Sequence, residues 1–345
     1  MRRTILPALI LCCAGAVSPT LAQPPTPPKQ SADALASPGK STSSSAVITA
    51  LAIAPGGQLV ATAGDDHLVR LWSTTSGRLV HLLKVHTDWV RTLAFSPDGS
   101  ILASAGDDGQ IVLWRAENGQ VARRIQASER PVYAIDFSPD GRTLAAAGFA
   151  QYVTLFDAQS GAVSQRLEGP AADLRAVTFS PDGGQLAAGG RGGRIRVWPL
   201  PRASTFRDLQ SSTARIRALA WLPDGQRLAS AGHGRTISIW EPSSGKEHYR
   251  FPCPAGTVMA MTVCGEDWLA TGGSDNVVRV WNWKTQTEVD RLVGHTGSVA
   301  AMAWDPASAT IITGSFDTTV RVWKLNLSSP PAADRAATRV DESRR

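Results

Sequence analysis

The sequence predicts an all-β fold, a seven-bladed β-propeller whose blades are four-stranded antiparallel sheets. The first observation is a period of 41 or 42 residues, marked by Trp72, Trp114, Phe156, Trp198, Trp240, Trp281 and Trp323. A fixed period in this range indicates an array of repeated supersecondary units. The second observation is that each unit contains four short strand patterns separated by turn residues. Seven such sheets bury their faces only against one another, and closing the ring removes its open ends.

The second repeat shows why each unit is four strands. Val90 to Phe95 alternates apolar and polar residues, as a half-buried strand does. Ser96-Pro97-Asp98-Gly99 has the composition of a β-turn, because proline fixes φ and glycine accepts a positive φ. The repeat continues with a strand at Ile101 to Ala105, a tight turn at Gly106 to Gly109, a strand at Gln110 to Trp114, a turn at Asn118-Gly119 and a strand at Gln120 to Ile125.

The repeats resemble those of the WD-repeat (WD40-type) family, which carry Gly-His before the first strand and Trp-Asp at the end of the third. Gly294-His295 is the one literal Gly-His, and the nearest match to Trp-Asp is Phe156-Asp157. The turn, the strand end of small residues and the aromatic residue fall in register in all seven copies. The resemblance covers Val47 to Leu327 and implies a propeller that binds partners on the face carrying its tight turns.

Residues 1–22 predict a signal peptide. Arg2-Arg3 is a basic start, Ile5 to Val17 is apolar, and small residues precede a cleavage site after Ala22. Cys12 and Cys13 raise the weaker alternative of a lipoprotein, but the residues before them are not the small ones that lipidation normally requires. We therefore expect an exported, bacterial-type family member, located in the periplasm or outside the cell, with no membrane insertion after signal removal.

The remaining chain divides into three parts. Residues 23–46 form a Pro/Ser-rich linker, residues 47–327 form the propeller, and residues 328–345 form a tail that we expect to be disordered. The repeats lie near 47–86, 90–127, 132–169, 174–212, 216–254, 258–295 and 299–327. Pro330-Pro331 stands where the last blade needs its fourth strand. Ala34 to Lys40 is the candidate to complete that blade, but Pro38 interrupts it, so we expect a weak or absent closure.

The net charge of +6 and the pI near 9.4 suggest a nucleic-acid partner only until the charges are located. The segment before residue 47 carries a net charge of +3 and the segment after residue 327 a net charge of +1, which leaves about +2 on the propeller. We therefore expect no nucleic-acid partner. Without the signal peptide, only Cys253 and Cys264 remain, about 20 Å apart along an extended strand. That separation is too long for a disulfide, so both should be thiols.

Two repeats contain the polar set that ties a blade together in family members. The resemblance implies a His before the first strand, a Ser or Thr on the second, an Asp in the tight turn and a Trp on the third. The complete sets are His86, Ser104, Asp108 and Trp114, and His295, Thr313, Asp317 and Trp323. We interpret both as structural rather than catalytic, because the period explains their spacing. Repeats 3, 4 and 5 have Ala150, Gly192 and Gly234 at the Asp position.

Residues that break the repeat on the tight-turn face are the candidate binding residues. Blades 1 and 2 present Asp65, Asp107 and Trp89, whereas blades 4 and 5 present arginines, so the face should be acidic on one side and basic on the other. The candidate residues are Trp89, Phe149, Arg191, Arg194, Arg215, His233, Arg235 and Phe316. Aromatic residues and arginine are enriched at binding hot spots. The hypothesis is a protein or peptide partner with an acidic segment over blades 4 and 5.

The sequence predicts an interaction scaffold rather than an enzyme. It has no nucleophile elbow, phosphate loop or metal-ligand spacing, so we expect no catalytic residue, no cofactor and no metal site. Gly189 to Gly193 resembles an RGG tract, but it occupies a tight-turn position. The alternative function is a propeller enzyme or ligand binder with its site in the central channel, where Arg91, Arg175 and Arg217 could bind an anion. We expect a monomer.

Overall fold

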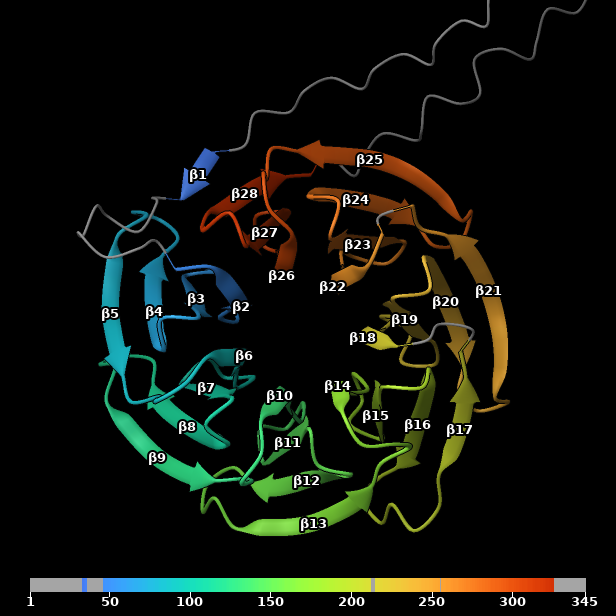
Figure 1. Cartoon of the computed structure of the whole chain (residues 1–345), viewed down its shortest axis with the longest axis horizontal. Coiled ribbons are helices and arrows are strands. Elements are labelled where there is room, and N and C mark those ends of the chain that lie inside the picture. Colours follow the sequence, from blue (N-terminus) through green and yellow to red (C-terminus); the bar gives the residue numbers. More distant parts are fainter. Residues whose placement is uncertain (1–32, 36–45, 212–214, 255, 326–345) are drawn as a thin grey trace, which may run out of the picture.

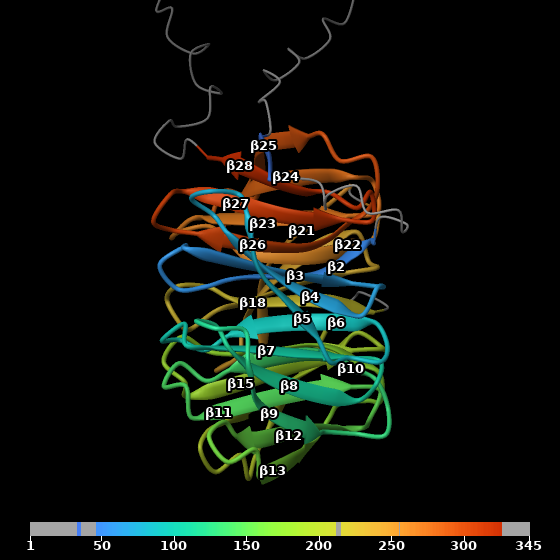
Figure 2. The same ribbon diagram turned by 90° about the vertical axis from the view of Figure 1, so that its left-hand side faces the viewer.

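The computed structural model describes residues 33–35, 46–211, 215–254 and 256–325 (Figure 1). It confirms the predicted fold, because the strands form seven four-stranded antiparallel sheets arranged as blades around a central channel. Figure 2 shows the ring edge-on as a short cylinder, thinner along the channel than across it. The described residues contain no helix, and therefore none that could cross a membrane. The predicted signal peptide, the tail and nearly all of the linker lie outside the described residues.

Each blade runs from a first strand beside the channel to a fourth strand at the outer edge (Figure 1). Blade 1 consists of β2 (Ile48–Ile53), β3 (Leu59–Gly64), β4 (Leu68–Ser73) and β5 (Leu79–Lys84). Blade 2 consists of β6 (Val90–Phe95), β7 (Ile101–Gly106), β8 (Gln110–Arg115) and β9 (Val121–Gln126). Blade 3 consists of β10 (Val132–Phe137), β11 (Thr143–Gly148), β12 (Tyr152–Asp157) and β13 (Val163–Glu168). In the second repeat, the strands start and end within one residue of the predicted bounds.

The other blades follow the same order. Blade 4 consists of β14 (Leu174–Phe179), β15 (Gln185–Gly190), β16 (Arg194–Pro199) and β17 (Arg207–Gln210). Blade 5 consists of β18 (Ile216–Trp221), β19 (Leu228–Gly232), β20 (Thr236–Glu241) and β21 (Lys246–Pro252). Blade 6 consists of β22 (Val258–Val263), β23 (Trp268–Gly273), β24 (Val277–Asn282) and β25 (Thr287–Val293). Blade 7 contains β26 (Val299–Asp305), β27 (Thr310–Ser315) and β28 (Val320–Lys324), and β1 (Asp33–Leu35) supplies its fourth strand.

The hydrophobic core lies between neighbouring blades. One cluster joins Leu71 of blade 1 to Val90 and Leu102 of blade 2, all fully buried. The small residues of the second strands allow this close packing, since Ala61 and Ala103 are buried completely. Burial of a leucine-sized side chain contributes about 1.5 to 3 kcal/mol. Because every blade buries both faces against its neighbours, the ring is stable only when it is closed.

The closure of the ring differs from our expectation. We predicted a weak or absent closing strand at Ala34 to Lys40, interrupted by Pro38. The structure instead pairs β1 with β28 in antiparallel register, with Asp33 opposite Val322 and Leu35 opposite Val320. The paired residues end before Pro38, so the proline does not interrupt the ladder. A segment before the first blade thus completes the last blade.

In six of the seven blades, the tight turn between the second and third strands contains a residue with left-handed φ. Glycine occupies this position in blades 2 and 4, where Gly109 and Gly193 have φ of 71° and 72°. Four other blades place a residue with a side chain there: His67, Arg235, Asn276 and Thr318, with φ between 55° and 69°. Thr318 is the most strained of these by residue type, because β-branched side chains disfavour positive φ.

The two cysteines of the described chain are both fully buried thiols, Cys253 before β22 and Cys264 after it. They do not form a disulfide, as the extended strand between them predicted. Burial raises the pKa of the Cys264 thiol to about 12. This thiol is therefore protonated and unreactive at neutral pH.

Candidate functional site

Four polar side chains of blade 7 form a hydrogen-bonded chain from Asp317 through His295 and Thr313 to Trp323. His295 Nδ1 lies 2.9 Å from Asp317 Oδ2, and His295 Nε2 lies 2.8 Å from Thr313 Oγ1. The indole of Trp323 donates to the same Thr313 oxygen at 2.8 Å. A neutral His295 satisfies every group, because Nδ1–H donates to the carboxylate while the Thr313 hydroxyl donates to Nε2. Burial lowers the pKa of His295, which agrees with this neutral form.

Blade 2 repeats the same arrangement. His86 Nδ1 lies 2.8 Å from Asp108 Oδ2, His86 Nε2 lies 2.7 Å from Ser104 Oγ, and Trp114 donates to Ser104 at 2.8 Å. Ser104 and Thr313 are completely buried, so neither hydroxyl can reach a substrate. The contacts therefore support the structural interpretation of the two sets, because every polar group in them points at another member of the set.

Blades 1 and 6 hold their turn carboxylates in a way that the sequence did not reveal. The third-strand arginine contacts the turn Asp in both blades, with Arg70 2.5 Å from Asp66 and Arg279 2.6 Å from Asp275. In blade 6 the position of the histidine is taken by Cys253, whose sulfur lies 3.8 Å from Thr271 Oγ1. The signal was present in the sequence, since arginine recurs at the same point of the third strand.

The tight turns and the blade-to-blade connections meet on one end of the ring, which we call the turn face. In six blades the two loops bond directly through their backbones, for example Asp107 N–H to Trp89 O at 2.9 Å and Arg191 N–H to Asp173 O at 3.1 Å. Each predicted pair of surface positions therefore forms one local unit. Repeat-breaking side chains on the two loops are placed side by side around the channel.

The three predicted aromatic residues are exposed on this face. Trp89, Phe149 and Phe316 have relative exposures of 38%, 41% and 41%. Two are covered on one side by a guanidinium group, since Arg91 lies 4.5 Å from the Trp89 ring centre and Arg130 lies 5.2 Å from that of Phe149. Such cation–π contacts hold the rings in fixed orientations.

Only part of the predicted basic set of blades 4 and 5 gathers around a single carboxylate, Asp173. Asp173 lies 2.6 Å from Arg175 and 3.6 Å from Arg215. Among the described residues, no carboxylate lies within ion-pair distance of Arg191, Arg217 or the nearby His233. Arg175, Arg215 and Arg217 carry three positive charges against the single negative charge of Asp173. The region therefore carries a net positive charge.

The pKa values of two neighbouring groups, His233 and Arg217, reflect this excess of positive charge. Burial lowers the pKa of His233, and Arg217 and Arg215 lower it further. Burial, followed by the repulsion from Arg175 and Arg215, also lowers the pKa of Arg217. Both groups would be stabilised in their charged forms by an anion placed between them.

The other two predicted arginines, Arg235 and Arg194, form no ion pair with Asp173 in the described structure. Arg235 is exposed in its turn, with no carboxylate of the described residues within ion-pair distance. Arg194 lies 3.9 Å from Asp208, which Arg196 already holds through two hydrogen bonds at 2.6 and 2.9 Å. The structure therefore separates Arg194 from the cluster around Asp173.

The predicted acidic half of the turn face is weaker than expected. Asp107 is held by Arg91 through two hydrogen bonds of 2.9 and 2.5 Å, which neutralise its charge. Asp65 accepts the backbone N–H of Val47 at 3.0 Å. Arg91 comes from the channel-lining strand of the same blade, a contact that the sequence pattern did not show.

The mouth of the channel contributes a small basic pocket of about 120 Å³. Its wall is formed mainly by the second residue of each first strand: Thr49, Arg91, Tyr133, Arg175, Arg217, Met259 and Ala300, with Phe316 at the rim. Arg175 stacks on Tyr133 with 3.6 Å between the guanidinium carbon and the ring centre. Tyr133 is a pocket residue that the sequence reasoning missed.

One carboxylate stands alone deeper in the same strands. Asp136, on β10, is half-buried and accepts the backbone N–H of Phe179 from blade 4 at 2.8 Å. Burial raises its pKa to about 7, despite the hydrogen bonds from Phe179 and Thr178. No group of three or more metal-ligating side chains occurs among the described residues. The polar contacts of Asp136 are with backbone N–H groups and the Thr178 hydroxyl.

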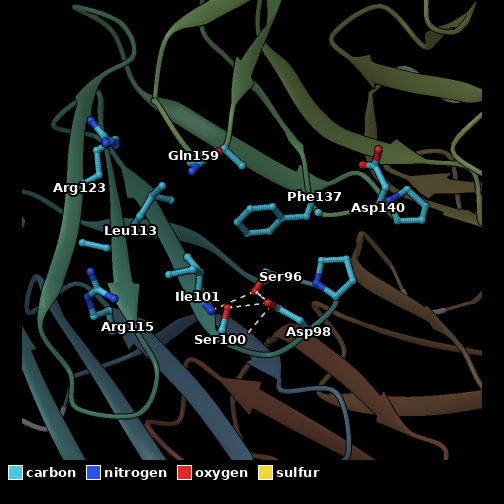
Figure 3. Close-up of a pocket in the computed structure, with 15 residues that line it drawn as sticks. Ser96, Asp98, Ser100, Ile101, Leu113, Arg115, Arg123, Phe137, Asp140 and Gln159 are labelled. Atoms are coloured by element: carbon cyan, nitrogen blue, oxygen red, sulfur yellow. Dashed lines mark hydrogen bonds between the residues drawn. The ribbon is translucent and has the colours of Figure 1, made fainter.

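A groove of about 740 Å³ lies at the opposite end of the ring, between blades 2 and 3 (Figure 3). Phe137 points into it, and Arg115 and Arg123 line its blade 2 side. Its carboxylates belong to turns, since Asp98 accepts hydrogen bonds from Ser96 and Ser100. Similar grooves of about 600 and 500 Å³ lie between blades 3 and 4 and between blades 7 and 1. The groove is thus a product of the repeat.

Comparison with known proteins agrees with this geometry. The family model for the WD domain, G-beta repeat, matches seven segments that cover more than three quarters of the chain: 38–73, 77–115, 119–157, 161–199, 204–241, 245–282 and 286–324. Each segment ends one residue after the recurring aromatic residue, and the six segments from residue 77 onward each join the fourth strand of one blade to three strands of the next.

Short stretches also match individual proteins. The chain is 39% identical over 70 residues to the B-type cell cycle switch protein ccs52B of Medicago truncatula, 38% identical over 69 residues to the protein transport protein sec13 of Emericella nidulans, and 43% identical over 54 residues to the anaphase-promoting complex subunit cdh1 of Dictyostelium discoideum. These matches span 16 to 18% of this chain and only 14%, 22% and 7% of those relatives. The seven matched repeats and the seven blades together show that the chain belongs to the WD40-repeat family.

Proposed function

We propose that the protein is a non-enzymatic interaction platform that binds an acidic segment of a partner protein or peptide on its turn face. The observation that carries the proposal is the excess of positive charge around Asp173, where Arg175, Arg191, Arg215 and Arg217 gather. Arginine binds carboxylates with planar, two-point geometry, and it is enriched at interaction hot spots. The relatives include a protein named as a subunit of a complex, which supports an interaction role.

The exposed aromatic residues extend this surface. Trp89, Phe149 and Phe316 stand on the same face and supply apolar contact area beside the charges. An interface with a few aromatic and arginine anchors needs no single deep cleft. We further propose that the mature chain works after export, as a monomer, because the first 22 residues have the composition of a signal peptide.

The test is a cross-linking pull-down from the native compartment with two charge reversals, Arg191→Glu and Arg215→Glu, in one chain. The expected result is loss of a stoichiometric partner that the unaltered chain captures. Arg124→Glu with Arg202→Glu is the matched control, because it makes the same change in charge at two exposed arginines that lie outside the turn face. Capture that survives the double reversal would contradict the proposal. Sequencing the N-terminus of the recovered protein tests export, since cleavage after Ala22 is expected.

A second candidate function is binding of a small anionic ligand in the channel mouth. The observation that favours it is the pocket of about 120 Å³ in which Arg91, Arg175 and Arg217 converge. Native mass spectrometry of the purified mature protein would then show a bound small molecule, and Arg217→Met would remove it. A mass equal to that of the polypeptide alone, together with partner capture, would favour the first function.

A further inference from the structure

Blade 3 has a pocket in the place where blades 2 and 7 hold their polar chain. The positions of the histidine, the hydroxyl and the carboxylate all hold small residues: Ser128, Ala146 and Ala150. These three residues line a pocket of about 220 Å³. The space that His86 and Asp108 fill in blade 2 is therefore open in blade 3.

Three other blades that lack the full set place an arginine of the third strand in this space, whereas blade 5 has Ser238 there. Arg70 and Arg279 do so in blades 1 and 6, each against its turn carboxylate. In blade 4, Arg196 reaches Asp208 and the backbone oxygen of Glu168, 3.1 Å away. Blade 3 has the short Thr154 at the equivalent place on β12, opposite Arg166 on β13. Thr154 and Arg166 both line the space, and a pocket remains open between them and the alanines.

The pocket has an apolar floor and a polar rim. Ala146, Ala147 and Val132 are buried beneath it. Thr154 and Arg166 stand at its edge. Among the described residues, neither the Thr154 hydroxyl nor the Arg166 guanidinium takes part in a hydrogen bond or an ion pair. An anionic group at the rim would therefore find an uncompensated positive charge.

The size of the pocket matches one aromatic ring. An apolar protein cavity of about 150 Å³ is sufficient to bind benzene, and this pocket of about 220 Å³ leaves room for the Cβ of a side chain. Its rim includes Tyr152, which is 49% exposed, and the adjacent turn carries Phe149, 41% exposed. Both rings offer edges against which an inserted aromatic side chain can pack.

We propose that this pocket receives one aromatic side chain of the partner segment, with a neighbouring carboxylate of that segment placed on Arg166. The inference rests on the proposed function, because it names the apolar anchor that accompanies the acidic contacts over blades 4 and 5. The occupant is a peptide whose aromatic residue is flanked by acidic residues. Its charge complements Arg130 and Arg166 on blade 3 and the cluster around Asp173.

The first experiment is methyl NMR of the full chain labelled at alanine, with phenylacetate as the probe. Phenylacetate combines a benzene ring with a carboxylate. The methyl signals of Ala127, Ala146 and Ala150 should shift and saturate together. Arg166→Gln should weaken the affinity by at least threefold. Absence of these shifts, or shifts only of alanines outside the pocket, would overturn the proposal.

The matched variants refill the pocket. S128H/A146S/A150D/F156W copies the residue set of blade 2, and Ala127→Leu, at a residue that also lines the pocket, is the milder version should the fourfold variant fail to fold. Both should abolish the phenylacetate shifts at the remaining alanines of the pocket. Ala162→Leu, in the exposed turn at the other end of the same blade, should leave the affinity unchanged. Binding that persists after refilling would be nonspecific and would overturn the assignment.

The second experiment separates the pocket from the proposed function. The peptide Ac-Glu-Glu-Phe-Glu-Glu-amide should bind at least tenfold more tightly than the same peptide with alanine at the centre, and Ala127→Leu should remove that difference. Partner capture that is lost in the Arg191→Glu/Arg215→Glu chain but unaffected by Ala127→Leu would overturn the pocket and leave the function standing. Phenylacetate binding in a chain that captures no partner would contradict the function and leave the pocket standing.

Discussion

Blade 7 and blades 3 to 5 use their polar side chains in opposite ways. In blade 7, His295, Thr313, Asp317 and Trp323 satisfy one another, and no polar group of the set is left to a partner. Blades 3 to 5 lack the carboxylate of the tight turn between the second and third strands, and two of their charged groups, Asp136 and Arg217, form no ion pair within the part of the chain that the structure describes. The difference indicates that the complete sets stabilise their blades internally, whereas the incomplete blades leave charged groups available for the partner contacts that we propose.

The largest expected effect is in the complete set. Asp317→Ala removes the acceptor of His295 and of the Thr296 and Thr319 donors, 2.8 and 2.6 Å away. Leaving buried donors unsatisfied should lower the free energy of unfolding by about 3 kcal/mol. Urea unfolding measures this change in the free energy of unfolding. Asp88→Ala is the exposed control, and we expect it to change the free energy of unfolding by less than about 0.5 kcal/mol. Equal effects of the two variants would show that the network contributes little.

The second prediction concerns the isolated carboxylate of blade 3. Because burial raises the pKa of Asp136 to about 7, the folded chain binds a proton there that the unfolded chain releases near pH 4. This contribution to stability is complete below about pH 4 and is lost as the pH rises to about 7. Relative to the unaltered chain, Asp136→Asn should therefore gain about 2 kcal/mol between pH 4.5 and pH 8, allowing for partial exposure.

Chemical unfolding at those two pH values measures this gain. The amide introduced by Asp136→Asn would keep an acceptor for the Phe179 N–H, so the comparison isolates the proton. A stability difference between the two chains that does not change with pH would show that Asp136 is ionised throughout. Asp317→Ala gives the opposite sign, because the pKa of Asp317 is lowered in the folded chain by its hydrogen bonds from Thr319, Thr296 and His295, despite burial.

The third prediction compares the same hydroxyl in a complete and an incomplete blade. Ser104→Ala in blade 2 leaves both His86 and Trp114 without their partner, whereas Ser230→Ala in blade 5 removes only the acceptor of Trp240, 2.9 Å away. The two variants should lower the free energy of unfolding by about 2 and about 1 kcal/mol respectively. Thermal or urea unfolding of the two variants measures these losses of stability. A larger loss for Ser230→Ala than for Ser104→Ala would contradict the proposed difference between the blades.

The smallest expected effect is a gain in stability. Thr318 adopts a φ of 69° in the tight turn of blade 7, where blade 2 has Gly109 at 71°. Thr318→Gly relieves the backbone strain of a β-branched residue and should raise the free energy of unfolding by about 0.5 kcal/mol, after the larger entropy loss of glycine. Gly109→Thr should lower it by a similar or larger amount. A loss of stability in Thr318→Gly would show that the threonine side chain contributes to the turn.

Sequence reasoning placed the strands well and the site only in part. The period and the turn residues located the strands of the second repeat to within one residue, because alternation and turn composition are local properties. Trp89, Phe149 and Phe316 stand on the turn face as expected, since each follows from its place in the repeat. The ion pairs Arg91–Asp107 and Arg175–Asp173 were not foreseen, because a side chain's partner depends on distances across the sheet.

The pocket of blade 3 illustrates the same limit. Ala146 and Ala150 are visible in the sequence as missing members of a set, but a missing side chain produces a cavity only if no neighbour fills it. Arg196 fills the space in blade 4, and Thr154 does not fill it in blade 3. The closing strand was misjudged for a related reason, since its pairing with β28 depends on where the ring brings the two ends together.

By itself, the sequence determined the number of blades, the strands within them and the two complete polar sets, because these repeat with a fixed period along the chain. Tertiary structure alone decided which charges are neutralised, which alanines border a pocket and how the ring is closed. The physical reason is that a repeat specifies each blade from residues close in sequence. Charge balance and cavity volume arise between side chains that only the closed ring brings within a few ångströms of one another.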